Sequence, residues 1–599
     1  MRRPHFLKGN SAMRLPLRMI WVDTEAENEH GLPEAGEQRL TFGVAIYEVY
    51  ANSNSLEPRT SDRLRFNNAG DFWDWVISKS VAGRSLWVMA HNWNYDAGIL
   101  NTSNEMSARG WISLKYINGK PPLIVRWGKD GKTITMVDTL NYFAGSVASI
   151  GKAIGLEKLT MPGSKATVAT WDDYAWRDVE IIKRGFLAFR EFVREHDCGV
   201  MQPTLASQAL TAYRHRFMPE KLLVHDDERA LELERESYHG GRTDCFWRGQ
   251  VKGPLYKLDI NSMYPAIMRN QPLATQLKAY FPSYKAAWFE SMMADFRVVA
   301  RCLICTNEPV YGVVRANRLI FPTGRFVAVL TTPEIKYARE NLHLQGVKEW
   351  ACYDSGVLFE SYVDYFVGLR KRYKREGNTT FDYLCKIMGN SLYGKFGQNG
   401  RKWVETEDYD SIEPGQGAIQ ETPDSPIVQL RMRLGRIQKL ETDGESENSI
   451  PMIASEITAY GRIQLWQLIK QAGLENLYYV DTDSLIVNSV GYLNLQSQLS
   501  DTALGFLKLE GTADDGEFWA PKDYRFGKER KTKGIRSTAV ALTPVEFEQD
   551  TFRSWDYNLK RGIDGHIDVV KTRKHLSRIN TKMQQTGNGR TTPIHLTEW

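Results

Sequence analysis

The stretch Tyr478–Val487 constrains the fold of this 599-residue chain most, because it places two acids between two apolar runs. β-Branched and aromatic residues on both sides of Asp481-Thr482-Asp483 predict a strand, a tight turn and a second strand. Alternate side chains of an extended chain share a face, so we expect Asp481 and Asp483 to point the same way. A divalent cation would relieve the repulsion between two such carboxylates. Asp-x-Asp also occurs at hairpin turns that simply face solvent, so this stretch alone does not decide between a metal site and a solvated turn.

Two upstream segments make the metal interpretation stronger. Asp259 follows the apolar run Leu255–Leu258 and lies 222 positions before Asp481. Between these acids, Lys386, Asn390 and Tyr393 are spaced i, i+4 and i+7, so they share one face of a predicted helix. We expect Gly394 to cap that helix.

In this order the three segments resemble the three polymerase motifs of family B DNA polymerases. The matching motifs are Asp259-x-x-Ser262-x-Tyr264-Pro265, Lys386-x-x-x-Asn390-Ser391-x-Tyr393-Gly394 and Tyr479-x-Asp481-Thr482-Asp483-Ser484. The resemblance implies that Asp259 and Asp483 hold two Mg²⁺ or Mn²⁺ ions, with Asp481 assisting. It also implies the residues that bind the incoming dNTP, namely Tyr264, Lys386, Asn390, Tyr393 and one of Arg370 and Lys374.

The N-terminal part contributes four further acids from three segments. Asp23 and Glu25 end a short apolar strand, and Asp96 follows the buried strand Leu86–Ala90. A predicted helix near residues 171–178 places Tyr174 and Asp178 one turn apart. Carboxylates from several segments are what a two-metal hydrolytic site requires.

These segments resemble the three exonuclease motifs of the DnaQ-like, RNase-H-like proofreading fold. The resemblance implies that Asp23, Glu25, Asp96 and Asp178 hold two metal ions and that Tyr174 orients the attacking water. Lys158-x-x-Met161 resembles an element of the protein-primed branch, whose lysine assists at the same site. Other positions of that branch grip the single-stranded 3′ end, and here they are His91, Asn92, Tyr95, Thr139 and Leu140.

Two more motifs predict contacts with DNA. Tyr238-His239-Gly240-Gly241 resembles the family's motif between the exonuclease and polymerase domains, and paired glycines allow a close approach to a template phosphate. Lys522-x-Tyr524 resembles a motif that contacts the primer strand, where basic and aromatic side chains suit a groove along a nucleic-acid backbone.

Composition is that of an ordinary globular protein, with 42% apolar and 25% charged residues. No run of 18 apolar residues predicts a transmembrane helix. Six cysteines fit a reducing compartment, and the single CxxC, Cys302 and Cys305, predicts a half-buried strand rather than a zinc site.

Residues 521–599 carry 16 Lys and Arg against 9 Asp and Glu, which suits a nucleic-acid clamp. Residues 1–22 hold five basic and no acidic residues, which fits a targeting segment or an unstructured basic tail. We expect the tail, because the compact apolar region of a secretory signal is missing.

The resemblance implies an α/β and α+β multidomain protein, with an RNase-H-like exonuclease domain and a right-hand polymerase of palm, fingers and thumb. The expected order is a basic tail (1–18), an exonuclease domain (19–200), a first palm part (201–268), a first insertion (269–359), fingers (360–397), a second insertion (398–450), a second palm part (451–520) and a thumb (521–599).

Chain lengths between the motifs indicate two insertions, which are either structural additions without a priming role or, as the resemblance to the protein-primed branch implies, parts of the priming machinery. Asp259 and Lys386 are 127 residues apart, and Lys386 and Asp481 are 95 apart, more than a palm strand and two finger helices need. In the protein-primed branch, typical of linear-genome bacteriophages and linear plasmids, the first insertion docks a terminal protein and the second closes around DNA.

We therefore expect a monomer without membrane association, located in a bacterial host, with a virus or in an organelle. Its expected partners are primer–template DNA, a single-stranded 3′ end, dNTPs and a terminal protein. The alternatives are a family B polymerase started from a nucleic-acid primer or unprimed, a stand-alone nuclease, and a non-catalytic replication scaffold.

Overall fold

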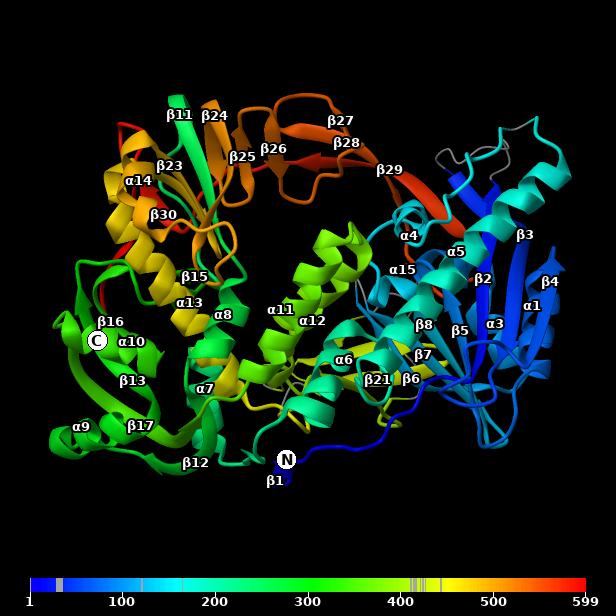
Figure 1. Ribbon diagram of the computed structural model, residues 1–599, viewed down its shortest axis with the longest axis horizontal. Helices are drawn as coiled ribbons and strands as arrows, with labels where there is room; N and C mark the ends of the chain where they lie inside the picture. The colour runs from blue at the N-terminus through cyan, green and yellow to red at the C-terminus, as the bar shows by residue number, and fades with distance from the viewer. Residues whose placement is uncertain are drawn as a thin grey trace.

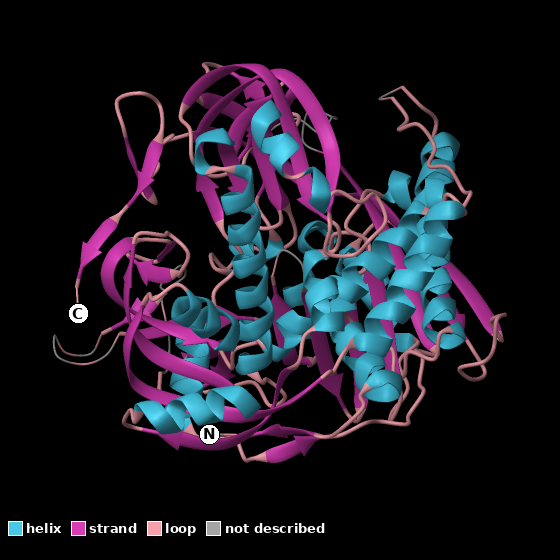
Figure 2. Cartoon of the chain, turned by 60° about the vertical axis from the view of Figure 1, so that its left-hand side comes forward, coloured by secondary structure: helices cyan, strands magenta, loops and turns pink. Residues whose placement is uncertain are grey.

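The computed structural model describes residues 2–27, 36–119, 122–163, 165–409, 412, 417–420, 422, 425, 427–441 and 444–598. Within these residues the strands form three large sheets, joined and covered by helices (Figure 1). Figure 2 shows how the helices pack between and beside the sheets. In this part of the chain, no helix has the length and apolar character needed to cross a membrane.

The N-terminal sheet has a mixed core in which β5 pairs in parallel with both β2 and β8, while β3 pairs antiparallel with β2. Helix α5 (Val168–Glu195) packs on β2 and β3. The strands are β2 (Arg18–Glu27), β3 (Gly36–Val49), β4 (Thr60–Phe66), β5 (Ser85–Ala90), β6 (Ile112–Asn118), β7 (Leu123–Lys129) and β8 (Lys132–Asp138). The short helices are α1 (Ala69–Ser78), α2 (Trp93–Ile99), α3 (Thr102–Ala108) and α4 (Val147–Ala153).

Three strands from the C-terminal part extend this sheet, which the sequence did not predict. They are β27 (Val540–Ala541), β28 (Glu546–Phe552) and β29 (Ile567–His575), and β29 pairs with β3. Figure 1 shows them passing from the central sheet over to the N-terminal sheet. The residues expected to form a thumb therefore connect both sheets.

The central sheet carries the predicted strand–turn–strand. Its order is β10 (Thr243–Cys245), β22 (Leu477–Asp481), β23 (Ser484–Asn488), β11 (Gly249–Ile260), β24 (Leu507–Ala520), β25 (Asp523–Phe526) and β26 (Glu529–Thr532). Val480 and Val487 pack into the main core with the long helix α13 (Pro451–Ala472), whereas Tyr479 and Ile486 pack with Phe518 on the opposite face. The alternation of side chains thus buries both faces.

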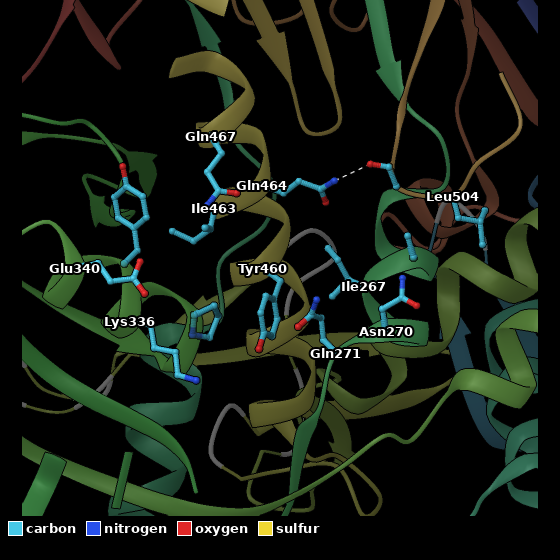
Figure 3. A pocket seen from close by; sticks show the side chains of 14 residues that line it. Ile267, Asn270, Gln271, Lys336, Glu340, Tyr460, Ile463, Gln464, Gln467 and Leu504 are labelled. Atoms are coloured by element: carbon cyan, nitrogen blue, oxygen red, sulfur yellow. Dashed lines mark hydrogen bonds between the residues drawn. The ribbon is translucent and has the colours of Figure 1, made fainter. Parts of the chain in front are cut away.

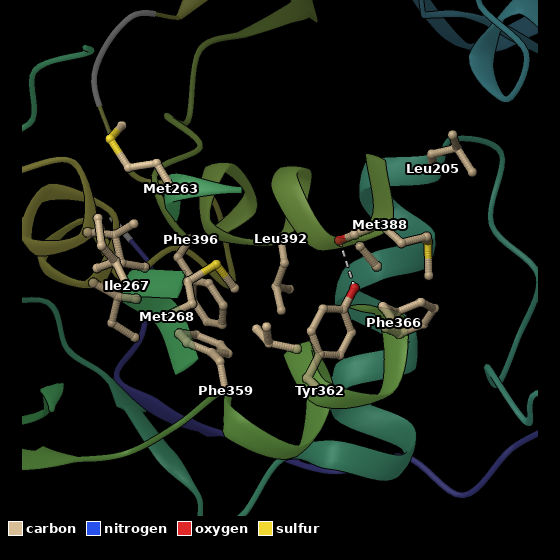
Figure 4. Close-up of a cluster of buried hydrophobic side chains, with 14 of the residues drawn as sticks. Leu205, Met263, Ile267, Met268, Phe359, Tyr362, Phe366, Met388, Leu392 and Phe396 are labelled. Carbon is tan, nitrogen blue, oxygen red and sulfur yellow. Dashed lines mark hydrogen bonds between the residues drawn. The ribbon is translucent and has the colours of Figure 1, made fainter. Parts of the chain in front are cut away.

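The predicted helical hairpin is confirmed, with helices α11 (Glu360–Arg375) and α12 (Thr379–Phe396). It packs on α6 (Leu205–Ala212) and on α8 (Met263–Asn270). Figure 4 shows this apolar cluster, in which the Tyr362 hydroxyl donates to the Met388 carbonyl at 2.8 Å. The predicted cap at Gly394 is wrong, because the helix continues to Phe396 and Gly397 follows it.

The first insertion forms a sheet of its own. Its strands are β12 (Leu273–Phe281), β13 (Arg297–Thr306), β16 (Thr323–Thr331) and β17 (Leu344–Gly356), with α9 (Ala286–Asp295) and α10 (Thr332–Glu340) beside them. The C-terminal strand β32 (His595–Thr597) pairs in parallel with β16 as a fifth strand. Helices α8, α10 and α13 line a cavity of about 450 Å³ here, shown in Figure 3. The CxxC cysteines lie on β13, with Cys302 buried and Cys305 half-buried, so the predicted half-buried strand is confirmed.

The second insertion contains the hairpin β20 (Val428–Arg433) and β21 (Arg436–Glu441), with β18 (Lys402–Glu405) and β19 (Ala418–Ile419) alongside. Part of this insertion, including residues 413–416, lies outside the described residues. The hairpin contacts the C-terminal helix α15 (Trp555–Leu559), where Arg433 forms a 2.9 Å ion pair with Asp556. Helix α15 in turn packs on α2 beside the N-terminal sheet.

The prediction of an unstructured N-terminal tail is wrong. Strand β1 (His5–Leu7) pairs with β9 (Leu222–Val224), and Arg2 donates hydrogen bonds to His225 and Ser449 carbonyls. These contacts satisfy backbone hydrogen-bonding groups of the N-terminal segment, and a count of basic residues cannot predict them.

Candidate active sites

Asp259 and Asp483 lie together at the end of two neighbouring central strands. Asp259 pairs with Ser484 in the register of β11 and β23, and the Ile260 N–H donates to the Asp483 carbonyl at 2.7 Å. Burial and repulsion from Asp483 raise the pKa of Asp259 to about 7. Burial also raises the pKa of Asp483 to about 6, with a smaller contribution from Asp481. The charged form of both carboxyl groups is therefore disfavoured, and a nearby cation would stabilise it.

Asp481 has a different environment, although it is only two residues away. Thr482 adopts a left-handed backbone with φ +63°, so the turn breaks the extended alternation assumed from sequence. The Asp481 carboxylate accepts hydrogen bonds from Thr243 Oγ1 at 2.9 Å and from Lys522 Nζ at 3.0 Å. Asp259 and Asp483 are thus the central pair, and Asp481 flanks it.

The α11–α12 hairpin contributes cations next to this pair. The ammonium group of Lys386, an exposed residue on α12, offsets part of the rise in the pKa values of Asp259 and Asp483 that burial causes. Arg370 donates to Ser262 Oγ at 3.1 Å and to Asp382 at 2.8 Å, so it faces the motif that contains Asp259. Lys374 is exposed near the end of α11. The geometry therefore favours Arg370 for the role that the sequence left open.

Aromatic side chains and glycines surround the turn. The Tyr264 and Tyr393 rings pack at 4.9 Å between centroids, and Asn390 lies one helical turn before Tyr393. Tyr238 covers Gly397, where a Cβ would come within 2.5 Å of its ring. A Cβ on Gly241 would come within 2.6 Å of Thr482, whereas Gly240 has nothing within 4 Å. Gly241 is thus needed by the protein's own acidic turn, and Gly240 remains open to an external group.

The second acid cluster sits on β2, α2 and α5 of the N-terminal unit. Thr24 donates to Asp96 Oδ1 at 2.7 Å, which ties β2 to α2. Burial and the acids Asp96, Glu25 and Asp178 raise the pKa of Asp23 well above its usual value. Burial first, and then neighbouring acids, raise the pKa values of Glu25 and Asp96 to about 7. All four predicted acids therefore lie in one negatively charged region, where Asp96 and Asp178 are buried and Asp23 and Glu25 are half-buried.

Lys158 is the cation of this cluster. It forms an ion pair with Asp178 and lies 4.4 Å from the centroid of the Tyr174 ring. Tyr174 and Asp178 are one turn apart on α5, as predicted.

Asp138, which the sequence analysis did not propose as a site residue, fixes the backbone of the loop at the start of α2 and of the segment after β8. Its carboxylate accepts hydrogen bonds from the N–H groups of Asn92, Trp93 and Leu140, each at 2.9 Å. Asn92 has φ +85°, a backbone conformation that these bonds hold in place. An aspartate at the end of a strand, followed by Thr-Leu, was the available signal.

The residues predicted to bind a single-stranded 3′ end lie on or beside the two segments that Asp138 holds. Asn92 and Leu140 line a cleft of about 490 Å³, while fully buried Thr139 bonds His91 Nδ1 at 2.9 Å and so positions it. Tyr95 packs edge-on against Phe552. The opposite wall comes from the C-terminal part, and sequence reasoning missed its members Arg536, Phe552, Arg553 and Tyr557.

The primer-motif residues occupy two different environments. Lys522 is exposed and reaches Asp481, whereas Tyr524 is 6% exposed and packs on Tyr479 at 4.7 Å. Glu510 on β24 also raises the pKa of Asp259, by less than Asp483 does, and the sequence analysis did not identify it.

Both clusters fit divalent metal ions by their chemistry. Hard cations such as Mg²⁺ take carboxylate oxygens, and the acids that gather in each cluster raise one another's pKa values. Asp178 Oδ1 is buried without a hydrogen-bond partner, so this oxygen is free for a ligand.

Residues 156–421 match the family model of DNA polymerase type B, organellar and viral. A probable DNA polymerase of Podospora anserina is 25% identical over 59% of this chain and 32% of the relative. The DNA-directed DNA polymerase of Enterobacteria phage PRD1 is 23% identical over 72% of this chain and 74% of the relative. The chain spans about a third of the length of the fungal relatives it matches.

The fold is that of Phi29 DNA polymerase. The structure of that protein complexed with primer–template DNA and incoming nucleotides superposes with a TM-score of 0.66 at 16% identity, covering 94% of this chain and 100% of the other. The resemblance and the fold class predicted from sequence are confirmed.

Proposed function

We propose that this chain is a DNA-directed DNA polymerase with a 3′–5′ exonuclease, that both activities use two-metal phosphoryl transfer, and that synthesis starts on a protein. The observation that carries the proposal is the presence of two separate acid clusters, one on the central sheet beside the α11–α12 hairpin and one on the N-terminal sheet. Bound Mg²⁺ or Mn²⁺ ions would activate the attacking oxygen and neutralise the leaving group at each cluster.

In polymerisation, Asp259 and Asp483 would hold the metal ions, with Asp481 assisting. Lys386 and Arg370 would neutralise the phosphates of an incoming dNTP, Lys386 as a point charge and Arg370 with its planar fork. Tyr264 would lie under the deoxyribose and exclude a 2′-hydroxyl. Asn390 and Tyr393 would line the pocket of the new base pair, which selects by shape and base pairing.

In degradation, Asp23, Glu25, Asp96 and Asp178 would hold the metal ions. Tyr174 would orient the attacking water, and Lys158 would keep Asp178 and Tyr174 in place. His91, Asn92, Tyr95 and Leu140 would bind the single-stranded 3′ end, with Thr139 supporting His91. The cleft of about 490 Å³ supports this path, because Asp138 in its wall raises the pKa of Asp96 and because Arg536 and Arg553 line its other side.

Contacts along the duplex complete the proposal. Lys522 would meet the primer strand, with Tyr524 fixing its hairpin from the core. Gly240 would approach a template phosphate while Tyr238 packs behind it.

Protein priming is supported by the first insertion, which is a separate sheet large enough to carry a docking surface. A terminal protein would supply a Ser, Thr or Tyr hydroxyl as the first acceptor. The alternative is a family B polymerase that extends a nucleic-acid primer only.

The proposal is tested by incubating the purified chain with a labelled primer–template and Mg²⁺. We expect extension with dNTPs and stepwise 3′–5′ shortening without them. A protein that binds the DNA but does neither would contradict the proposed function.

A further inference from the structure

Lys522 neutralises Asp481, the acid that flanks Asp259 and Asp483. Its Nζ lies 3.1 Å from Asp481 Oδ1 and 3.0 Å from Oδ2, so the ammonium group bridges the carboxylate. Thr243 Oγ1 donates to the same Oδ1 at 2.9 Å. The carboxylate that would assist in metal binding is therefore already engaged by the protein's own donors.

The turn that carries Lys522 is held in a fixed conformation. Lys522 has φ +62°, a left-handed conformation that non-glycine residues adopt at an energetic cost. Its N–H donates to the Tyr479 hydroxyl at 2.7 Å. The next residue, Asp523, is 3% exposed and forms an ion pair with Arg578 at 3.5 Å. The lysine is thus aimed at Asp481 by contacts on both sides of the turn.

The ion pair itself is easily broken. The Lys522 side chain is 56% exposed and that of Asp481 is 26% exposed. Water screens such a pair, so it contributes little to stability, and a phosphate oxygen offers the ammonium group a competing partner.

We infer that Lys522 is an exchangeable counter-charge, which covers Asp481 while the DNA groove is empty and releases this carboxylate for metal binding when a primer phosphate takes the ammonium group. The inference rests on the proposed function, because it assumes that a primer strand passes Lys522. Primer binding and metal binding then strengthen each other by the same factor, as linkage requires.

The test measures Mn²⁺ affinity by electron paramagnetic resonance on the full chain carrying Asp23→Ala and Glu25→Ala, so that the N-terminal cluster contributes no signal. Lys522→Gln should tighten Mn²⁺ binding in the absence of DNA by roughly two- to fivefold, as expected for an exposed pair. In an Asp481→Asn background, where Asp259 and Asp483 still bind Mn²⁺, the same substitution should change nothing. Primer–template DNA should tighten Mn²⁺ binding more in the parent chain than in the Lys522→Gln variant.

A matched control is Lys531→Gln, because its side chain is 59% exposed and its partner is Glu529 at 3.8 Å. This variant should keep the parent Mn²⁺ affinity. Unchanged or weaker affinity in Lys522→Gln, or an equal gain in the Asp481→Asn background, would overturn the inference. Failure of the proposed function has a different signature, since the unmodified chain would then not extend a primer.

Discussion

At the scale of single residues, the acids of the N-terminal cluster oppose folding when no metal is bound. Asp23 faces Asp96, Glu25 and Asp178 in a buried region, so its charged form is disfavoured. Glu25 and Asp96 rise from 4.5 and 3.8 to pKa values of about 7. A carboxyl whose folded pKa exceeds its unfolded value binds more protons when folded. Stability of the metal-free protein should therefore fall as pH rises from about 4 to about 7.

Asp23→Asn should stabilise the metal-free protein, because it removes one buried charge and keeps the shape. We expect the free energy of unfolding to increase by about 1–2 kcal/mol at pH 8 and the gain to shrink at pH 5. Denaturant melts in EDTA measure this. Exposed Asp173 on α5, the helix that carries Asp178, is the control, and Asp173→Asn should have no effect. Equal stability of Asp23→Asn and the unmodified protein at pH 8 would contradict the electrostatic account.

Tyr264→Val should admit ribonucleotides, because the ring that would block a 2′-hydroxyl is lost. We expect discrimination between dNTP and rNTP to fall by roughly tenfold or more, measured as the ratio of kcat/KM values. Tyr264→Phe keeps the ring packed on Tyr393 and should keep discrimination. An unchanged ratio in the valine variant would make Tyr264 a packing residue only.

At the scale of elements, the hairpin of β22 and β23 depends on the segment that precedes β10. The Thr482 N–H donates to the Arg242 carbonyl at 2.6 Å, and the Thr482 side chain fits against Gly241. A methyl group at Gly241 would push the turn that carries Asp481 and Asp483.

Gly241→Ala should therefore reduce primer extension at least tenfold, since a displacement of about 1 Å at a reacting centre has large effects on rate. Degradation of a single-stranded oligonucleotide should be unaffected, because the N-terminal cluster is distant. Gly587→Ala is the matched control, as nothing lies within 4 Å of its added methyl and this glycine has no proposed contact with DNA. Full extension activity in Gly241→Ala would show that the turn tolerates the shift.

Local patterns predicted the elements whose signals are local. The alternation in Tyr478–Val487 gave the hairpin, and the i, i+4 spacings gave the faces of α5 and α12. The pairings of β29 with β3, β32 with β16 and β1 with β9 join segments far apart in sequence. Short strands with mixed composition do not specify such partners. Lys522 on Asp481 and the three bonds of Asp138 were equally invisible, because they depend on tertiary placement.

At the scale of the whole molecule, the first insertion is joined to the central unit by buried ion pairs. Arg297 on β13 pairs with Glu456 on α13 at 2.7 Å, and Glu334 on α10 pairs with Arg462 at 2.8 Å. The insertion is therefore a separate sheet with a rigid attachment, which suits a docking unit.

Deletion of residues 269–359 should abolish transfer of a labelled dNTP to a Ser, Thr or Tyr of a terminal protein. Glu456 and Arg462 would lose buried partners, so Glu456→Gln and Arg462→Met should accompany the deletion. Extension of a DNA primer by the same variant is the control for folding and should persist. Unimpaired transfer after the deletion would show that the insertion does not serve priming.

The central claim is that one chain holds two independent metal-dependent sites. The direct measurement is a time course of one labelled primer–template with Mg²⁺, with and without dNTPs. Asp483→Ala, and likewise Asp481→Ala, should abolish extension and leave 3′–5′ shortening, whereas Asp23→Ala with Glu25→Ala should do the reverse. Extension at the unmodified rate by Asp483→Ala, or persistent shortening by the double variant, would contradict the account.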